Sequence, residues 1–207
     1  MLAVSSVSPR TGTNVRAMDL FLGVVLASVV FFVWSAISWM ALPWQRRLFK
    51  EFRDENAMAQ AFDEQAPASG IYGVPSEPRY PAGATKEQRA AIDRAAYERL
   101  QRGPIVFAVI ARSGYPSYPR MLVLAFLGNV VVSLAFAWML AQTTGLGYAE
   151  RVAFLLVASL AAGIACRVPD WNWHKFPLEH ALVNIASLAV GWVLSGVVLA
   201  YYVRGQG

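Results

Sequence analysis

The sequence predicts an all-α integral membrane protein: a four-helix transmembrane bundle with a small mixed α/β insert between its first two helices. The chain is 57% hydrophobic and only 15% charged, whereas soluble domains carry about 25% charged residues. Its apolar residues gather in four runs, and about 20 such residues suffice to cross a bilayer. A charged segment of 76 residues with seven prolines separates the first run from the other three.

The four runs cover residues 20–42, 121–141, 152–168 and 178–203. We expect helices, because hydrocarbon offers no hydrogen bonds to an open backbone. The first run is too long for the apolar core of a signal peptide, so we interpret it as a retained membrane helix. The links at 142–150 and 169–177 are short, which predicts an antiparallel series. The domains are therefore a tail and first span (1–44), an insert (45–120) and three further spans (121–207).

Small residues at intervals of four predict where the helices touch, because close approach in lipid favours Gly, Ala and Ser. The predicted helix-packing residues are Gly23, Ala27, Ala125, Asn129, Ser133, Ala162, Gly163, Ser187, Gly191 and Ser195. Asn129 and Asn184 should face inward, where a polar group finds partners. They would be structural contacts or, in an alternative hypothesis, the lining of a polar path through the membrane.

The link between the last two spans contains both histidines of the chain. Asp170, His174, Glu179 and His180 predict a metal or proton-transfer site in one hypothesis, since imidazole and carboxylate are common ligands and proton carriers. Their spacing fits no His-Glu-x-x-His element. A structural interpretation is favoured: Glu179 suits the positive end of the last helix, and Arg167 can pair with Asp170.

The insert is predicted to contain two helices and a short β-pairing. Helical spacing of apolar residues over 44–65 predicts one helix, supported by the i,i+4 pairs Arg47–Glu51 and Lys50–Asp54. Thr85 and Gln88 form a capping-box pattern that starts a second helix ending near Arg102. Residues 70–74 and 105–111 are expected to pair as two strands, although such a unit is marginal alone.

Aromatic residues at the predicted span ends mark the membrane–water boundary. The expected anchors are Trp44, Trp171, Trp173, Tyr201 and Tyr202. Fourteen basic residues lie on the side of the insert, against Arg10, Arg16, Arg151 and Arg204 on the other. The positive-inside rule therefore predicts a cytoplasmic insert and both termini outside.

Three stretches, residues 34–44, 69–75 and 103–107, resemble a family of uncharacterised bacterial multi-span membrane proteins. The resemblance covers most of the chain. It implies a multi-span bacterial membrane protein, and it implies no activity, cofactor or catalytic residue. We expect the protein in the inner membrane.

No nucleotide-binding loop, nucleophile elbow or Cys-x-x-Cys element occurs in the sequence. The leading hypothesis is a non-enzymatic accessory, scaffold or assembly subunit that packs against other membrane subunits or against itself. The alternatives are a small transporter or channel, and a membrane metal or redox site. The bilayer is an expected partner, nucleic acid is not, and the cofactor stays unknown.

Overall fold

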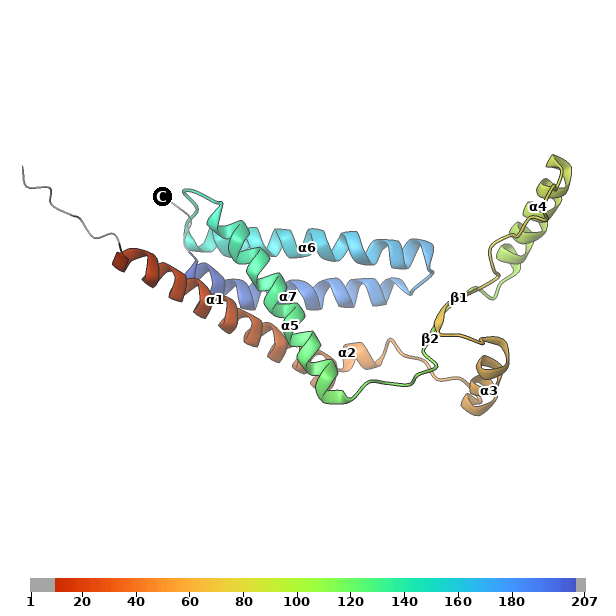
Figure 1. Ribbon diagram of the computed structural model, residues 1–207, viewed down its shortest axis with the longest axis horizontal. Coiled ribbons are helices and arrows are strands. Elements are labelled where there is room, and N and C mark those ends of the chain that lie inside the picture. The colour runs from red at the N-terminus through yellow and green to blue at the C-terminus, as the bar shows by residue number, and fades with distance from the viewer. Residues whose placement is uncertain (1–9, 204–207) are drawn as a thin grey trace, which may run out of the picture. The chain divides into compact units, whose positions relative to one another are not determined.

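A computed structural model describes residues 10–203, with side chains from residue 17 onward. The elements are α1 (Arg10–Ala36), the π-helical turn η1 (Ile37–Ala41), α2 (Pro43–Arg46), α3 (Glu55–Gln65), β1 (Gly70–Val74), α4 (Lys86–Arg102), β2 (Val106–Ile110), α5 (Tyr118–Ala141), α6 (Tyr148–Trp173) and α7 (Leu178–Tyr202) (Figure 1). They form two compact units. The bundle unit extends to Phe49 and includes Ser117–Trp171 and the chain from Pro177; the insert unit is Lys50–Pro116 with Asn172–Phe176.

Four helices of the described chain are long and apolar enough to cross a membrane, which confirms the predicted fold class. They span Ala17–Ala41, Tyr118–Ala141, Tyr148–Trp173 and Leu178–Tyr202. In the apolar 18-residue stretch of each helix, only 17% to 33% is buried within the protein. The remaining apolar surface faces outward, so the protein is an integral membrane protein in contact with the lipid bilayer.

The bundle core forms where α1 packs against both α5 and α7. Trp192 is 3% exposed. Its ring centroid lies 4.4 Å from that of Phe31 on α1 and 4.6 Å from that of Phe136 on α5. Aromatic rings at such distances contribute beyond the apolar area they bury. One tryptophan of α7 therefore joins three spans.

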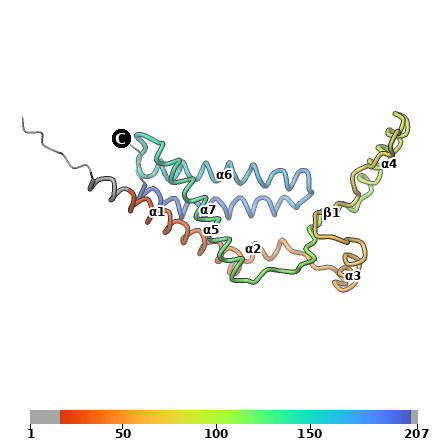
Figure 2. The backbone as a smooth tube through the Cα atoms, viewed as in Figure 1, coloured from red at the N-terminus to blue at the C-terminus, as the bar shows by residue number. Residues whose placement is uncertain are grey.

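Helices α6 and α7 run side by side in opposite directions (Figures 1 and 2). A methyl group at Gly196 of α7 would lie 3.3 Å from Leu155 of α6, and one at Gly163 of α6 would lie 3.2 Å from Leu188 of α7. The two glycines thus allow helices α6 and α7 to approach closely at two positions along their length. The short links predict this antiparallel order.

The insert unit contains the predicted hairpin and the predicted second helix. Strands β1 and β2 pair antiparallel, with Tyr72 opposite Ala108. Helix α4 begins with a full capping box, in which Thr85 and Gln88 exchange side chain-to-backbone hydrogen bonds. Both predictions are confirmed. Helix α3 precedes β1 at one end of the hairpin, and α4 connects the two strands at the other end (Figure 1).

Two predicted helix boundaries are wrong. The chain is not one helix over 44–65: α2 stops at Arg46, and α3 starts only at Glu55, after Asp54 accepts a hydrogen bond from the Ala57 amide. An i,i+4 ion pair adds only about 0.2–0.5 kcal/mol, which is too little to outweigh a new N-cap.

The other error is the predicted link at 169–177, because α6 continues through Pro169 to Trp173. Proline near a helix end in a membrane protein is tolerated when the freed carbonyl finds another partner.

Three of the four basic residues on the side of the termini are not fully described. The side chains of Arg10 and Arg16, and the whole of Arg204, are outside the described residues. The sidedness of the insert and of the termini therefore stays a prediction.

Candidate functional site

The most elaborate polar site of the bundle surrounds the π-helical turn at the end of α1. The Trp34 indole donates to the Ser187 carbonyl at 2.8 Å. The hydroxyl oxygens of Ser38 and Ser187 lie 2.8 Å apart. The Trp44 indole donates to the carbonyl and hydroxyl oxygens of Ser38, each at 3.1 Å. Trp34 and Trp44 meet edge to face at 6.2 Å. We call these four residues the tryptophan–serine cluster.

The local sequence explains the wide turn beneath this cluster. The Leu42 amide bonds to the Ile37 carbonyl at 3.1 Å, a spacing of five residues instead of four. Pro43 cannot continue the helix, because it has no amide hydrogen, but it suits the first turn of α2. Such π-turns are frequent at functional sites. Here the turn brings the Trp44 indole back onto the carbonyl of Ser38.

A buried amide lies next to the cluster. Gln45 is 2% exposed, and its Oε1 accepts no hydrogen bond from another described residue. The cluster and Gln45 together offer indole, hydroxyl and amide groups, none of which titrates near neutral pH. Their chemistry is therefore that of hydrogen bonding between helices, and it does not supply an acid or a base.

Hydroxyl groups continue along α1 as a second polar contact line. The Ser28 and Ser133 oxygens are 3.0 Å apart and join α1 to α5. The Ser195 hydroxyl donates to the Ala27 carbonyl at 3.0 Å and joins α7 to α1. All three serines are fully buried. Together with the tryptophan–serine cluster they form the α1 seam, which ties α1 to its two neighbours.

The predicted helix-packing residues fall into two groups. Gly23, Ala27, Ser133, Gly163, Gly191 and Ser195 are buried, whereas Ser187 and Asn129 are half-buried and Ala125 and Ala162 are exposed. Two of the glycines fit tightly. A methyl group at Gly191 would lie 2.7 Å from atoms of both Phe31 and Trp34, and one at Gly23 would lie 2.7 Å from Tyr202.

The two asparagines of the polar-path hypothesis do not bond to each other. Asn184 donates to the His180 carbonyl at 2.7 Å, one turn earlier in the same helix. Asn129 is half-buried on α5 and has no hydrogen bond to another described residue. A polar path along these residues stays a hypothesis.

The four residues of the metal hypothesis are divided between the two units. Asp170, Glu179 and His180 belong to the bundle unit, and His174 belongs to the insert unit. Arg167 pairs with Asp170 at 3.0 Å, as the structural interpretation of the link expects. Within residues 10–203, no three His, Cys, Asp or Glu side chains come together as a metal-binding group.

The link between α6 and α7 has a role in the insert unit. The His174 ring stacks on the Phe107 ring of β2, with their centroids 4.4 Å apart. The Phe176 ring also meets the Phe107 ring, with their centroids 6.1 Å apart. Phe107 and His174 are 67 positions apart in the sequence, and no spacing rule matches residues at such a separation, so sequence reasoning missed this contact. The link thereby covers part of one face of the hairpin.

The predicted interface anchors differ in their surroundings. Trp171, Trp173 and Tyr201 are exposed, as a side chain that faces lipid or headgroups would be. Tyr202 is half-buried and meets the Tyr201 ring edge to face at 5.1 Å. Trp44 is half-buried in the tryptophan–serine cluster.

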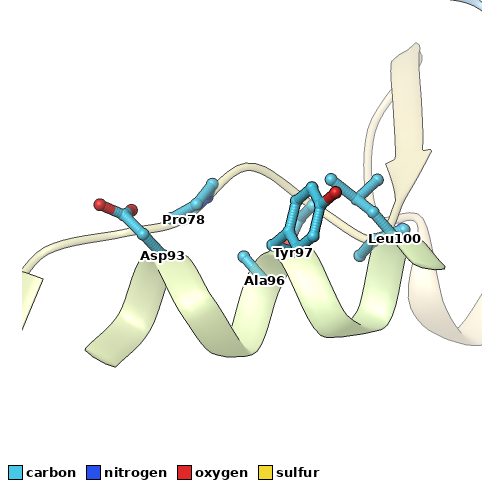
Figure 3. A pocket seen from close by; sticks show the side chains of 7 residues that line it. Pro78, Asp93, Ala96, Tyr97 and Leu100 are labelled. Atoms are coloured by element: carbon cyan, nitrogen blue, oxygen red, sulfur yellow. The ribbon is translucent and has the colours of Figure 1, made fainter. Parts of the chain in front are cut away.

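A shallow cavity of about 210 Å³ lies in the insert unit, between the proline-rich segment 75–78 and α4 (Figure 3). Ala96, Tyr97 and Leu100 line it with Pro78. Nearby, the Tyr80 hydroxyl bonds to Asp93, which raises the pKa of Tyr80 above its usual value, and Arg89 lies over the Tyr80 ring at 5.6 Å. The cavity is smaller than about 300 Å³, the volume at which ligand pockets usually begin.

Sequence reasoning also missed several residues that join the helices. Ser28, Ser38 and Gln45 were not predicted, although Ser28 and Ser38 lie in a span with few other polar residues. At the opposite end of the bundle, Tyr148 donates to the Val197 carbonyl at 2.9 Å and Arg151 to the Ala200 carbonyl at 3.0 Å. Polar residues within or next to an apolar run were the available signal.

Comparison with protein-family models, with curated proteins and with solved structures gave no match to this chain.

Proposed function

We propose that the protein is a membrane scaffold subunit. Its transmembrane helices pack against other membrane subunits, and its insert binds a protein surface outside the lipid core. The observation that carries the proposal is the insert itself: it holds two capped helices and a hairpin, but among residues 50–116 only Ala66 is buried. Secondary structure in a folded protein depends on burial of an apolar face.

Exposed apolar side chains of the insert support a protein partner. Ile71 and Val109 are cross-strand neighbours, 69% and 74% exposed. Tyr97 and Leu100 are exposed on α4 beside the shallow cavity. Aromatic and aliphatic side chains next to a cavity are typical anchors of protein interfaces.

The outer faces of the spans support packing against other membrane subunits. In α5 and in α6, only 17% of the apolar 18-residue stretch is buried within the protein. The outward face of α6 carries the small exposed residues Ala153, Ala161, Ala162 and Ala165. Small residues allow another helix to approach closely in lipid.

Photocrosslinking in the native membrane tests the proposal. Benzoylphenylalanine is placed at Ile71, at Tyr97 or, as a matched exposed control, at Glu64. We expect a discrete protein adduct from the first two positions and none from Glu64. The adducts should disappear when Leu100→Glu or Val109→Glu is added in the full-length chain.

A protein that is extracted in mild detergent as a monodisperse monomer, with no adduct from either position, would contradict the proposal. Thermal unfolding of each variant separates loss of a partner from loss of the bundle fold. The substituted positions lie outside the bundle core, so we expect unfolding of the bundle to be unchanged.

A further inference from the structure

A basic segment follows the first span directly. Residues 44–53 contain four basic side chains and a single acidic one, Glu51. The basic residues are Arg46, Arg47, Lys50 and Arg53. We call these ten residues the juxtamembrane segment.

The positive charges of this segment are not compensated within the described chain. None of the four basic residues forms an ion pair with another residue of 17–203. A helix over 44–65 would pair Arg47 with Glu51 and Lys50 with Asp54, but the chain is not helical between Arg46 and Glu55. Asp54 instead caps α3 through the Ala57 amide. The break in the helix therefore leaves the cations available to an anion.

Aromatic and apolar side chains accompany the charges. Trp39 is 50% exposed, Met40 64% and Phe49 68%, and the rings of Trp39 and Phe49 lie 6.4 Å apart. Phe52 is exposed as well. Exposed aromatic rings at the end of a span are typical of the headgroup level of a bilayer. A site for a soluble anion would have no need of these apolar neighbours.

The start of the segment is held at the end of the span. The Trp44 indole bonds to Ser38 of η1, Gln45 is buried, and an Arg46 guanidinium nitrogen lies 3.4 Å from the Met40 carbonyl. Helix α5 begins at this same end of the bundle, with the exposed residues Tyr118 and Arg120 in its first turn. Because α1 is a membrane span, these contacts place the start of the segment at the bilayer surface.

We propose that the juxtamembrane segment binds the headgroups of anionic phospholipids, with Arg46, Arg47, Lys50 and Arg53 on the phosphates and Trp39 and Phe49 among the upper acyl carbons. Each basic residue near an anionic surface strengthens binding by about fivefold. Amphipathic elements with a basic face and aromatic residues bind membranes in this way.

The test uses the purified full-length protein and counts retained lipids by native mass spectrometry, in mixtures of phosphatidylglycerol and phosphatidylcholine. The test variant is R46Q/R47Q/K50Q/R53Q. The control is R79Q/K86Q/R94Q/R99Q in the insert. It also removes three arginines and one lysine, but from positions outside the juxtamembrane segment. We expect at least a tenfold loss of the preference for phosphatidylglycerol in the test variant and an unchanged preference in the control.

Two results would overturn the proposal. An equal loss in both variants would show an effect of net charge alone. Displacement of phosphatidylglycerol by inorganic phosphate at comparable concentration would show that the ligand is a free anion.

A second measurement uses fluorescence quenching and keeps the proposal testable if the test variant does not fold. Brominated phosphatidylglycerol should quench the tryptophan fluorescence of the unmodified chain more than brominated phosphatidylcholine does. The difference should shrink in Trp39→Phe and stay unchanged in Trp138→Phe, which changes an exposed tryptophan in the last turn of α5. Equal quenching by both lipids in the unmodified chain would contradict lipid selectivity.

Discussion

At the scale of single residues, the bundle depends on positions where a side chain would not fit. Gly191 lies against Phe31 and Trp34. Neither ring can easily move, because Phe31 packs on Trp192 and the Trp34 indole is bonded to the Ser187 carbonyl. The sequence indicates a small residue here, but it does not show which neighbours require it.

Substitution of Gly191 by alanine should destabilise the bundle by about 1–3 kcal/mol, the usual cost of overpacking a filled core. The matched control is Gly128→Ala, because Gly128 lies in α5 with no atom within 4 Å of an added methyl group. The control should be neutral or stabilising by up to about 1 kcal/mol through helix propensity. Unfolding by denaturing detergent in mixed micelles measures both. Equal effects of the two substitutions would mean that the close approach at Gly191 is unimportant.

At the scale of elements, the α1 seam shows what a periodic pattern cannot reveal. Several small residues of the predicted stripes are buried, but Ala125 and Ala162 are exposed. An interval of four places residues on one face of a helix; it does not say whether another helix covers that face. The serines that do join helices, Ser28 and Ser133, are matched only by the packing of α1 against α5.

A double-mutant cycle with Ser28→Ala and Ser133→Ala should give a coupling energy of about 0.6 kcal/mol, the mean for hydrogen bonds between membrane helices. Ser35, a half-buried serine of α1 without a hydrogen bond to Ser133, provides the control pair. Its cycle with Ser133→Ala should give no coupling. A coupling as large for the control pair would remove the argument for a specific α1–α5 bond.

At the scale of the whole molecule, four spans require the insert and the α6–α7 link to lie on one side of the membrane. The contact of His174 and Phe176 with Phe107 agrees with this requirement. The basic residues around the insert predict that this side is the cytoplasmic one.

Labelling with a membrane-impermeant maleimide measures the sidedness in sealed, right-side-out vesicles. The background is Cys166→Ser, which removes the single cysteine. A cysteine at Ser76 in the insert should be protected until the vesicles are opened, whereas one at Thr144, in the α5–α6 link, should react at once. The reverse pattern would place the insert outside.

The sequence by itself determined the membrane class, the four spans, the start of α4 and the pairing of β1 with β2. These features depend on local quantities: apolar length, a capping box and β-forming residues between turns. Tertiary structure decided which polar groups meet. Ser38, Trp44 and Ser187 come together because a π-turn and a neighbouring helix place them there. The break after Arg46 is local in origin, because the weak i,i+4 ion pairs lose to the cap at Asp54, and sequence reasoning misjudged that balance. Contacts between distant segments depend on how the helices pack, and the spacing of residues within one segment does not predict that packing.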